Sequence, residues 1–418
     1  MSPLKFKIEK KLKNGLGRAG VLTTPHGDIQ TPAFVTVGTK ATVKSLSPEQ
    51  VKDLGAQVVL ANTYHLYLEP GDKTIKEAGG IHKFMNWNGP IMTDSGGFQA
   101  FSLGADFGKK IGKISASRNN AELTQTVAEE NNGLQEEPTM AKIDEDGVTF
   151  KSYIDGSEHK FTAERSIEIQ HNIGADMIFA FDECTSPRAS HQYQKEAMDR
   201  THRWAIRSLK KHKELLLRKS ALSPHESALF GIVQGGRFQD LREESAKTIA
   251  KMDFDGFGIG GSFTKEDMNT AVGWVNKLLP EDKPRHLLGI GEPADLFGGV
   301  ESGSDLFDCV APTRIARNGS LYTNNGRINI FNTQFRNDFT PVDINCVCYT
   351  CTNYTRGYIA HLFRSKEMFA ATLASIHNLY FTVHLVDKIR QSILDVNFEK
   401  FKDSFLADYY ANKNAIDK

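Results

Sequence analysis

The segment HLLGIGEPADLFGGVESGSDLFDCV, residues 286–310, holds two short apolar runs that each stop abruptly at a glycine or a polar residue. A helix-sized stretch separates the two runs, which is typical of parallel strands joined by a helix. Six further runs of the same kind precede them, at residues 34–40, 58–66, 90–95, 177–184, 229–237 and 256–262. Eight strand-like runs with helix-sized stretches between them predict an α/β fold, a (β/α)8 TIM barrel.

The functional side chains of such a barrel gather at the C-terminal ends of its strands. The ends of the eight runs supply a set of mostly polar or glycine residues. We expect these residues to meet at one mouth of the barrel: Asn62, Asp94, Asp182, Gln234, Gly260, Gly261, Leu288, Gly289 and Asp308.

The length of the chain predicts more than a barrel. It has 418 residues, whereas a barrel alone needs roughly 250. We expect a barrel domain over residues 1–345, a flexible surface insertion within it at about 104–142, and a zinc-binding subdomain with C-terminal helices over residues 346–418. The insertion is inferred from composition, because the segment is polar and nearly free of aromatic residues.

Local patterns predict several elements outside the barrel strands. Residues 148–162 are typical of a hairpin with its turn at Asp155-Gly156, and residues 163–173 of a helix leading into the next strand. Towards the C-terminus, amphipathic patterns predict helices at 354–363, 366–386 and 387–409.

The charge balance of the chain neither supports nor excludes a nucleic-acid partner. Lysine plus arginine and aspartate plus glutamate each number 51, so any nucleic acid has to meet a local basic patch. The N-terminal segment lacks the apolar stretch of a signal peptide, and no later segment approaches roughly 18 consecutive apolar residues. We therefore expect a cytoplasmic protein with no membrane partner.

Three of the five cysteines crowd into six residues: Cys346, Cys348 and Cys351. Since a cytoplasmic protein keeps its thiols reduced, this spacing favours a metal site over disulfides. Three thiolates and one imidazole fill the tetrahedral shell of one Zn2+ ion, which defines a structural site. A chance cluster of free thiols is the alternative. Three histidines on predicted helices could supply the imidazole: His377, His361 and His384. The spacing favours His377 but does not exclude the other two.

Two carboxylates end different runs, Asp94 in TDSGGFQ (93–99) and Asp308 in FDCVAPTR (307–314). A pair of carboxylates at one mouth permits glycosyl transfer, in which one attacks an anomeric carbon and the other moves protons. The alternative is a structural role, in which either carboxylate caps a helix or pairs with Arg314 or Arg317. We favour the chemical role because the whole set is expected at one mouth.

Several other positions suit a flat, purine-like ligand. Asp182 can accept hydrogen bonds from a ring N–H and an exocyclic amine, and the Gln234 carboxamide can donate a hydrogen bond to a carbonyl. Gly260 and Gly261 offer backbone amides, and the Phe98 ring can stack on a base. Bracing of a loop is the alternative for Gln234, and core packing is the alternative for Phe98.

A basic stretch follows the Asp308 run. Arg314 and Arg317 lie where guanidinium groups suit the phosphates beside a flipped-out nucleotide, and Arg327 comes shortly after. Lys388 and Arg390, further along, are typical of a solvated helix face.

Taken in order, these motifs resemble the tRNA-guanine transglycosylases, also called queuine tRNA-ribosyltransferases, and above all the bacterial type. The likeness runs from about Leu16 to Tyr409 and is interrupted by the 104–142 insertion. It is carried by TDSGGFQAFSLG (93–104), FDECTSP (181–187), GIVQGG (231–236), GIGGS (258–262), LLGIGEP (287–293), FDCVAPTRIARNG (307–319) and the three clustered cysteines with His377.

The resemblance implies a reaction. Such enzymes exchange guanine at the wobble position of tRNAs with GUN anticodons for a 7-deazaguanine, in queuosine biosynthesis. By this likeness Asp308 attacks C1′ of the ribose and forms a covalent RNA–enzyme intermediate. Asp94 serves as general acid and base, and Asn62 positions it.

The resemblance also implies binding roles. The base is held by Asp182, Gln234, Gly261 and Leu288, with Phe98 stacked on it. Arg314 and Arg317 contact the RNA, and His377 completes the zinc site. Bacterial members are homodimers built partly through the zinc element, whose counterparts here include Tyr354, Tyr358 and His361.

One loop departs from the family pattern. Residues 262–266 read SFTKE, where the family has a Leu, a Ser or Ala, a small residue, Gly and Glu. Glu266 keeps the acidic residue that bacterial members use indirectly for the aminomethyl group of preQ1, and Cys184 matches the bacterial pocket. Because Thr264 replaces a residue linked to base selectivity, queuine stays open as the incoming base, although we favour preQ1.

Two other functions compete with this one. A non-catalytic, tRNA-binding partner subunit would have lost the acidic pair, whereas Asp94 and Asp308 are both present. A barrel metallohydrolase would need several histidines at strand ends, and the runs offer only His65 and His286.

Overall fold

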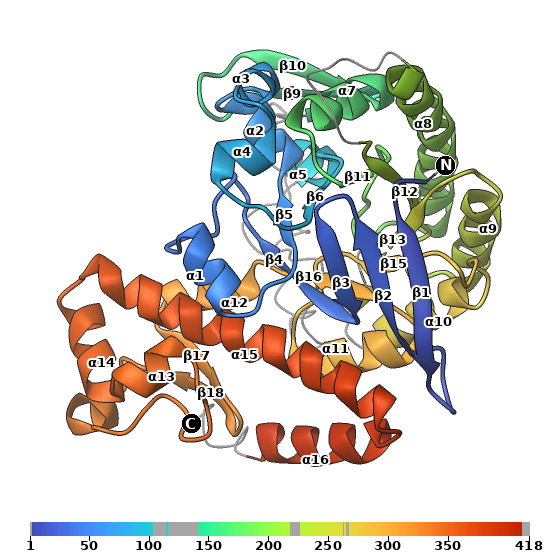
Figure 1. The fold of residues 1–418 in the computed structure, drawn as a ribbon. Helices are drawn as coiled ribbons and strands as arrows, with labels where there is room; N and C mark the ends of the chain where they lie inside the picture. The colour runs from blue at the N-terminus through green and yellow to red at the C-terminus, as the bar shows by residue number, and fades with distance from the viewer. Residues whose placement is uncertain are drawn as a thin grey trace, which may run out of the picture. The chain divides into compact units, whose positions relative to one another are not determined.

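The computed structural model describes residues 2–102, 114–115, 141–217, 226–261, 263–264 and 267–411 (Figure 1). The insertion expected at 104–142 lies almost entirely outside the described residues. Two residues of it form strand β7 (Ile114–Ser115), which pairs in parallel with β14 (Phe263–Thr264).

Eight strands close into a barrel in the order β11-β12-β13-β15-β16-β4-β5-β6. Neighbouring strands are parallel wherever their register is known. Each of the eight apolar runs overlaps one barrel strand, so the predicted TIM-barrel fold is confirmed. The strands are β4 (Ala33–Val37), β5 (Val59–Ala61), β6 (Ile91–Thr93), β11 (Met177–Phe179), β12 (Ala228–Val233), β13 (Gly256–Ile259), β15 (Arg285–Leu287) and β16 (Leu306–Asp308).

The chain divides into two compact units. Unit 1 comprises Met1–Ala61, Ile81–Met92 and Pro284–Lys418, and unit 2 comprises Asn62–Gly80 and Thr93–Lys283. Unit 1 therefore carries β4, β5, β15 and β16, and unit 2 carries β11, β12 and β13.

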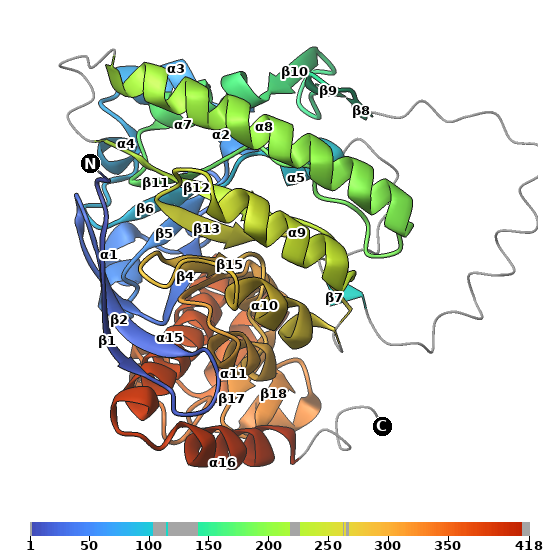
Figure 2. The same cartoon turned by 90° about the vertical axis from the view of Figure 1, so that its right-hand side faces the viewer.

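In unit 2, helices follow the strands and pack on one another. They are α2 (Thr63–Leu68), α3 (Asp72–Glu77), α5 (Gly97–Ser102), α7 (Ala163–Ile173), α8 (His191–Leu217), α9 (Gln239–Ala250) and α10 (Met268–Asn276). Figure 2 shows α8 and α9 side by side. Helix α7 has the predicted bounds because Thr162 caps its N-terminus, accepting from the Arg165 N–H at 3.2 Å, and Gly174 ends it in a left-handed conformation.

The predicted hairpin is also present in unit 2. Strands β9 (Gly147–Lys151) and β10 (Glu158–Thr162) pair antiparallel, and β8 (Ala141–Ile143) adds a third strand. The link between β9 and β10 contains Asp155-Gly156, with Gly156 at φ +75°. The turn therefore lies where the sequence predicted it.

Unit 1 begins with a small antiparallel sheet of β1 (Lys5–Lys11), β2 (Arg18–Thr24) and β3 (Gly27–Thr31). A buried ion pair ties this sheet to the barrel, since the Arg18 guanidinium donates to both oxygens of Asp305 at 2.9 and 2.8 Å. Asp305 directly precedes β16, so the contact helps to fix the strand that ends at Asp308.

Unit 1 contains eight further described helices. They are α1 (Pro48–Asp53), α4 (Ile81–Met85), α11 (Pro293–Glu301), α12 (Ala311–Arg317), α13 (Tyr349–Asn353), α14 (Arg356–Arg364), α15 (Met368–Leu394) and α16 (Phe398–Tyr410). Those from α12 onward, with the strands between them, form what we call the C-terminal element, residues 311–410. Between α12 and α13 lie the hairpin of β17 (Ser320–Thr323) and β18 (Gly326–Asn329) and the 3-10 turn η2 (Thr333–Asn337). Figure 1 shows α15 passing beside this hairpin.

Helix α15 is the core helix of the C-terminal element. It packs against α12, α13, α14 and β4, and it is longer than predicted, since it continues to Leu394. Its length and apolar composition would also suit a membrane span, but 67% of that stretch is buried inside the protein. Burial of this kind is expected of a helix around which other elements pack.

Candidate catalytic and metal-binding sites

Four groups of predicted site residues come together in the structure. Asn62 meets Asp94, Asp182 meets Gln234 and the Gly260-Gly261 pair, Gly289 meets Asp308, and the three clustered cysteines meet His377. The first two groups lie in unit 2 and the other two in unit 1.

The Asp94 carboxylate lies just after β6 and accepts hydrogen bonds from side-chain and backbone N–H groups. The Asn62 side-chain amide donates to Oδ2. The backbone N–H groups of Thr63 and Gly96 donate to Oδ1 at 2.9 and 3.2 Å. Asn62 is also the N-cap of α2, because its side-chain oxygen accepts from the His65 N–H. The start of α2 thus fixes the orientation of the carboxylate, as a proton-transfer group requires.

A second carboxylate of unit 2 is buried in a polar pair. The Asp182 side chain is 6% exposed and accepts from the Gln234 amide at 2.6 Å and from the Ser95 hydroxyl at 2.9 Å. Gln234 Oε1 is buried and accepts no hydrogen bond within the described residues. An acceptor left open beside a buried carboxylate suits a ligand that brings several N–H groups, as the edge of a guanine does.

The Gly260-Gly261 turn packs directly on the Gln234 amide. A Cβ on Gly260 would lie 2.7 Å from Gln234 Nε2, and Gly261 has φ +99°. Beneath the turn lies Arg242, which is fully buried and donates to the carbonyls of Gly260 at 2.8 Å and Gly236 at 2.6 Å. Burial lowers the pKa of Arg242 to about 9. This guanidinium therefore joins the ends of β12 and β13 below the amide.

In unit 1, the last residue of β16 is Asp308. Its Oδ1 accepts from the backbone N–H of Gly289 and lies within hydrogen-bond distance of His286 Nε2, each at 2.9 Å. The His286 side chain is fully buried, whereas that of Asp308 is 13% exposed. The partial exposure of Asp308 suits a carboxylate that meets a substrate.

The predicted RNA-binding arginines follow on helix α12. Arg314 is exposed, and Arg317 is partly buried with a buried Nη1 that has no hydrogen-bond partner within the described residues. Burial and the neighbouring Arg314 cation lower the pKa of Arg317. No carboxylate pairs with either guanidinium in the described part of the chain, so the structural pairing considered from the sequence is not seen there, and both remain available to phosphate.

Two further predicted residues are partly buried side chains beside these groups. Phe98 lies on α5, four residues after Asp94, and Leu288 lies between β15 and Gly289. The loop residues Ser262, Lys265 and Glu266 lie outside the described residues, and only the backbone of Thr264 is described.

The cysteine cluster forms the fourth group. The Nδ1 atom of His377 lies 3.8, 3.5 and 3.3 Å from the sulfur atoms of Cys346, Cys348 and Cys351. All four potential ligand atoms lie within 4.8 Å of one another. Of the three candidate histidines, His377 is therefore the one that lies beside the three cysteines.

These distances fit a tetrahedral metal ion. Zinc–sulfur bonds of about 2.3 Å and zinc–nitrogen bonds of about 2.0–2.1 Å give a sulfur–nitrogen separation of about 3.6 Å. Nε2 of His377 lies 2.6 Å from the Tyr322 carbonyl, so it donates there and Nδ1 is free to bind a metal. The ligand set is complete and largely buried, so the site suits a structural metal rather than a catalytic one.

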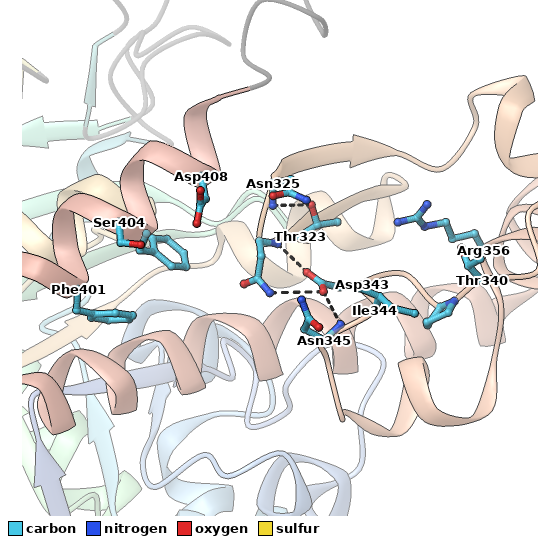
Figure 3. A pocket seen from close by; sticks show the side chains of 13 residues that line it. Thr323, Asn325, Thr340, Asp343, Ile344, Asn345, Arg356, Phe401, Ser404 and Asp408 are labelled. Carbon is cyan, nitrogen blue, oxygen red and sulfur yellow. Dashed lines mark hydrogen bonds between the residues drawn. The ribbon is translucent and has the colours of Figure 1, made fainter.

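A separate cavity lies in the C-terminal element (Figure 3). It measures about 520 Å3 and lies between the β17–β18 turn, the 340–345 loop and α16. Within it the Asp343 carboxylate is occupied by the backbone N–H groups of Asn324 and Asn345, at 2.7 and 3.0 Å. None of the residues predicted from the sequence to act on a substrate lines this cavity.

Some partners of the site were not recognised from the sequence. They are Ser95 and Thr63, which donate to Asp182 and Asp94, Arg242 under the glycine turn, and His286 on Asp308. His286, Ser95 and Thr63 had a usable signal, because each lies within a strand-end run. Arg242 gave none, since its contacts are fixed only by the fold.

Comparison with known proteins gives consistent matches. The family model described as queuine tRNA-ribosyltransferase matches residues 13–131 and 119–411. A queuine tRNA-ribosyltransferase of Streptococcus gordonii is 47% identical over 416 residues, which cover 99% of this chain and 98% of the relative. Relatives of the same description from Streptococcus pneumoniae strains CGSP14 and ATCC BAA-334 are 46% identical over the same coverage.

Proposed function

The chain belongs to the queuine tRNA-ribosyltransferase family and is a tRNA-guanine transglycosylase, a pentosyltransferase; we propose that it exchanges the wobble guanine of tRNAs with GUN anticodons for a 7-deazaguanine in queuosine biosynthesis. The observation that carries the proposal is the presence, orientation and partial exposure of the two carboxylates. Asp94 and Asp308 are both present, and each is oriented by N–H donors while retaining partial exposure.

In the proposed mechanism, Asp308 is the nucleophile. One carboxylate oxygen attacks C1′ of the ribose, the C1′–N9 bond to guanine breaks, and a covalent RNA–enzyme ester forms. Asp94 acts as general acid and base, giving a proton to the leaving base and taking one from the incoming base. Asn62 positions Asp94 through the amide contact to Oδ2.

The base is proposed to lie against the buried pair of Asp182 and Gln234. Asp182 accepts from ring and exocyclic N–H groups of a guanine-like base, and the open Oε1 of Gln234 supplies a further acceptor. Gly260, Gly261, Leu288 and Gly289 offer backbone groups around the base, and Phe98 stacks on it. Arg314 and Arg317 bind the phosphates of the anticodon loop.

The incoming base is proposed to be preQ1, with queuine as the alternative. Cys184 and Glu266 match the bacterial pattern for the aminomethyl group, whereas Thr264 does not. A different role, as a non-catalytic tRNA-binding partner subunit, is disfavoured because both carboxylates are retained.

We also propose a structural metal ion, a cellular location and an oligomeric state for this enzyme. One structural Zn2+ per chain binds to the four ligands of the cysteine cluster. The enzyme is cytoplasmic, with no membrane partner, and acts as a homodimer. An aromatic cluster on the C-terminal element supports the dimer: Tyr349, Tyr358 and Phe369 each contact the Tyr354 ring, and these three are more than a third exposed.

The proposed function is tested by incorporation of radiolabelled guanine into an unmodified tRNA transcript with a GUN anticodon, with preQ1 and queuine as competitors. We expect incorporation that one competitor blocks at low concentration, which also identifies the base. Asp308→Asn should abolish exchange and leave tRNA binding intact. Exchange by Asp308→Asn at near wild-type rate would remove this residue from the nucleophile role. No exchange by folded wild-type protein would instead support the partner-subunit function.

A further inference from the structure

We propose that Glu183 is a positioning residue for base recognition: its ion pair with Arg200 fixes the segment 181–186 on helix α8 and thereby holds the Asp182 carboxylate where it meets the base. The inference rests on the proposed function, because it takes Asp182 as the residue that binds the base. It assigns a task to a carboxylate that is only 1% exposed and for which the mechanism above has no use.

Helix α8 holds Glu183 at three points. The Tyr193 hydroxyl donates to Oε1 at 2.8 Å, and the Arg200 guanidinium donates to Oε2. The backbone N–H of Glu183 donates to the Thr201 hydroxyl at 3.0 Å. The side chains of the ion pair are 1% and 19% exposed, so solvent and salt screen it little. The backbone and the side chain of this residue are therefore tied to the same helix.

The rest of the segment is tied to α8 as well. The Phe181 N–H donates to the Ser208 hydroxyl at 3.2 Å, and the Thr185 hydroxyl donates to Gln194 Oε1 at 2.6 Å. Gln194 Nε2 in turn donates to the Ser186 carbonyl at 3.0 Å. Residues 181–186 belong to no helix or strand. Hydrogen bonds to α8 thus take the place of strand pairing in this segment.

The sequence of α8 explains how one helix serves the whole segment. Gln194, Thr201 and Ser208 are seven residues apart, and so are Tyr193 and Arg200. Seven residues make about two helical turns, so each set forms one row along the helix, and the two rows are adjacent. The segment meets these rows in reverse order along the chain, so it runs antiparallel to α8.

The anchored segment carries Asp182 between two of its contacts with α8. The Asp182 carboxylate accepts from Ser95 and from Gln234, on the side of the proposed base pocket. Gln194 also packs on the turn that follows Gln234, because a Cβ on Gly236 would lie 2.7 Å from its amide. Helix α8 therefore braces both residues that are proposed to bind the base, and a shift of the segment would change the distance between them.

Loss of the Glu183 charge should weaken base binding and leave the chemistry intact. Glu183→Gln keeps the side-chain shape and the acceptor for Tyr193, but its neutral amide no longer pairs with Arg200. The segment is then held less firmly, whereas Asp94 and Asp308 are not touched. A change confined to base binding raises the KM for the base and leaves kcat unchanged. A role in folding alone would instead reduce the amount of active enzyme, so that kcat falls and the KM for guanine stays constant.

The test compares variants of the full-length, metal-loaded enzyme. Glu183→Gln removes the charge of the carboxylate. Arg200→Met removes the cation and keeps most of the stem, and Arg200→Lys is the conservative variant that keeps the cation. Arg203→Met is the matched control, since Arg203 lies on the same helix and pairs with the exposed Glu145, outside the segment.

The measurement is steady-state incorporation of labelled guanine into GUN-anticodon tRNA, with guanine and tRNA varied in turn. For Glu183→Gln and Arg200→Met we expect the KM for guanine to rise by about tenfold, since a displacement of roughly 1 Å can cost up to about a hundredfold. At saturating guanine, kcat and the KM for tRNA should stay close to wild type. Arg200→Lys should recover part of the loss, and Arg203→Met should behave like wild type.

Three results would overturn the inference: a wild-type KM for guanine in Glu183→Gln, an equal rise in the KM for tRNA, or the same defect in Arg203→Met. Should Glu183→Gln unfold early, Tyr193→Phe carries the test, because it removes one neutral donor and keeps the ion pair. In that variant, too, the KM for guanine must rise.

Failure of the proposed function looks different. Wild type would then incorporate no guanine, or Asp182→Asn in the same assay would keep the wild-type KM for guanine. Failure of the inference alone leaves Asp182→Asn impaired and Glu183→Gln normal.

Discussion

At the scale of single residues, Gly261 gives a direct test of the base pocket. Its φ is +99°, and an added Cβ would overlap the Arg242 guanidinium and approach Gln234 Oε1 to 3.2 Å. We therefore expect Gly261→Ala to displace the glutamine amide and to lower kcat/KM for guanine by tenfold or more, which corresponds to about 1.4 kcal/mol. Steady-state exchange with varied guanine at saturating tRNA measures the effect.

A matched glycine serves as the control for that substitution. Gly273 lies inside α10 in the same unit, and an added Cβ there meets nothing within 4 Å. Gly273→Ala should leave exchange unchanged and stabilise the protein by about 0.5–1 kcal/mol, because alanine is the better helix former. Wild-type kinetics in Gly261→Ala would show that the glycine turn does not shape the base pocket.

The sequence predicted which residues lie at the strand ends. It predicted only some of the hydrogen-bond partners of those residues. Asp182 and Gln234 stand out because each directly follows an apolar run. The Ser95 hydroxyl that donates to Asp182 lies 87 residues away along the chain, and no spacing rule connects the two. Hydrogen bonds between distant segments depend on strand order and register, which single-residue patterns do not contain.

At the scale of elements, a pair of histidines couples the packing of α7 and α8 to pH. His171 Nε2 and His212 Nδ1 lie 2.9 Å apart between the two helices. Burial lowers the pKa of His171 to about 3 and that of His212 to about 4. Both pKa values lie below that of an unfolded histidine, so the unfolded chain binds more protons in the acid range and stability falls as the pH drops below about 6.5.

We therefore expect a loss of about 2 kcal/mol per histidine in the free energy of unfolding between pH 7.5 and pH 5. Urea unfolding monitored at both pH values measures this loss. In His212→Phe, which removes one of the two groups, the pH dependence should shrink. An unfolding free energy that is equally pH-dependent in wild type and variant would mean that other groups control acid stability.

The bounds of elements were predictable where the chain carries capping signals. Helix α7 matches its predicted range because Thr162 and Gly174 signal its ends. By contrast, the break expected at 386–387 falls at 395–397, since α15 runs to Leu394 and α16 begins at Phe398. Neither glycine nor proline signals that break. The turn instead passes through Val396 at φ +59°, a conformation that its side chain disfavours and that tertiary packing imposes.

At the scale of the whole molecule, metal removal tests how the C-terminal element is held together. Cys348 and Cys351 belong to the apolar core of this element, so the metal site and the core should form together. We expect about one zinc per chain by elemental analysis, and Cys351→Ser should lose it with destabilisation on the order of several kcal/mol. His384→Asn is the control, because His384 contacts the Tyr380 carbonyl instead of the cluster. Retention of metal by Cys351→Ser with unchanged stability would contradict the site.

The assembly state is tested at the exposed aromatic cluster of the C-terminal element. Tyr358 is 42% exposed and stacks on Tyr354 with ring centroids 5.4 Å apart. If this surface joins two copies, Tyr358→Glu places a charge in the interface, and sedimentation should show a monomer that keeps its unfolding temperature. Ile206→Glu is the matched control, because Ile206 on α8 is 57% exposed but belongs to unit 2 and should leave the dimer intact. A dimer that tolerates Tyr358→Glu but dissociates with Ile206→Glu would move the interface to the other unit.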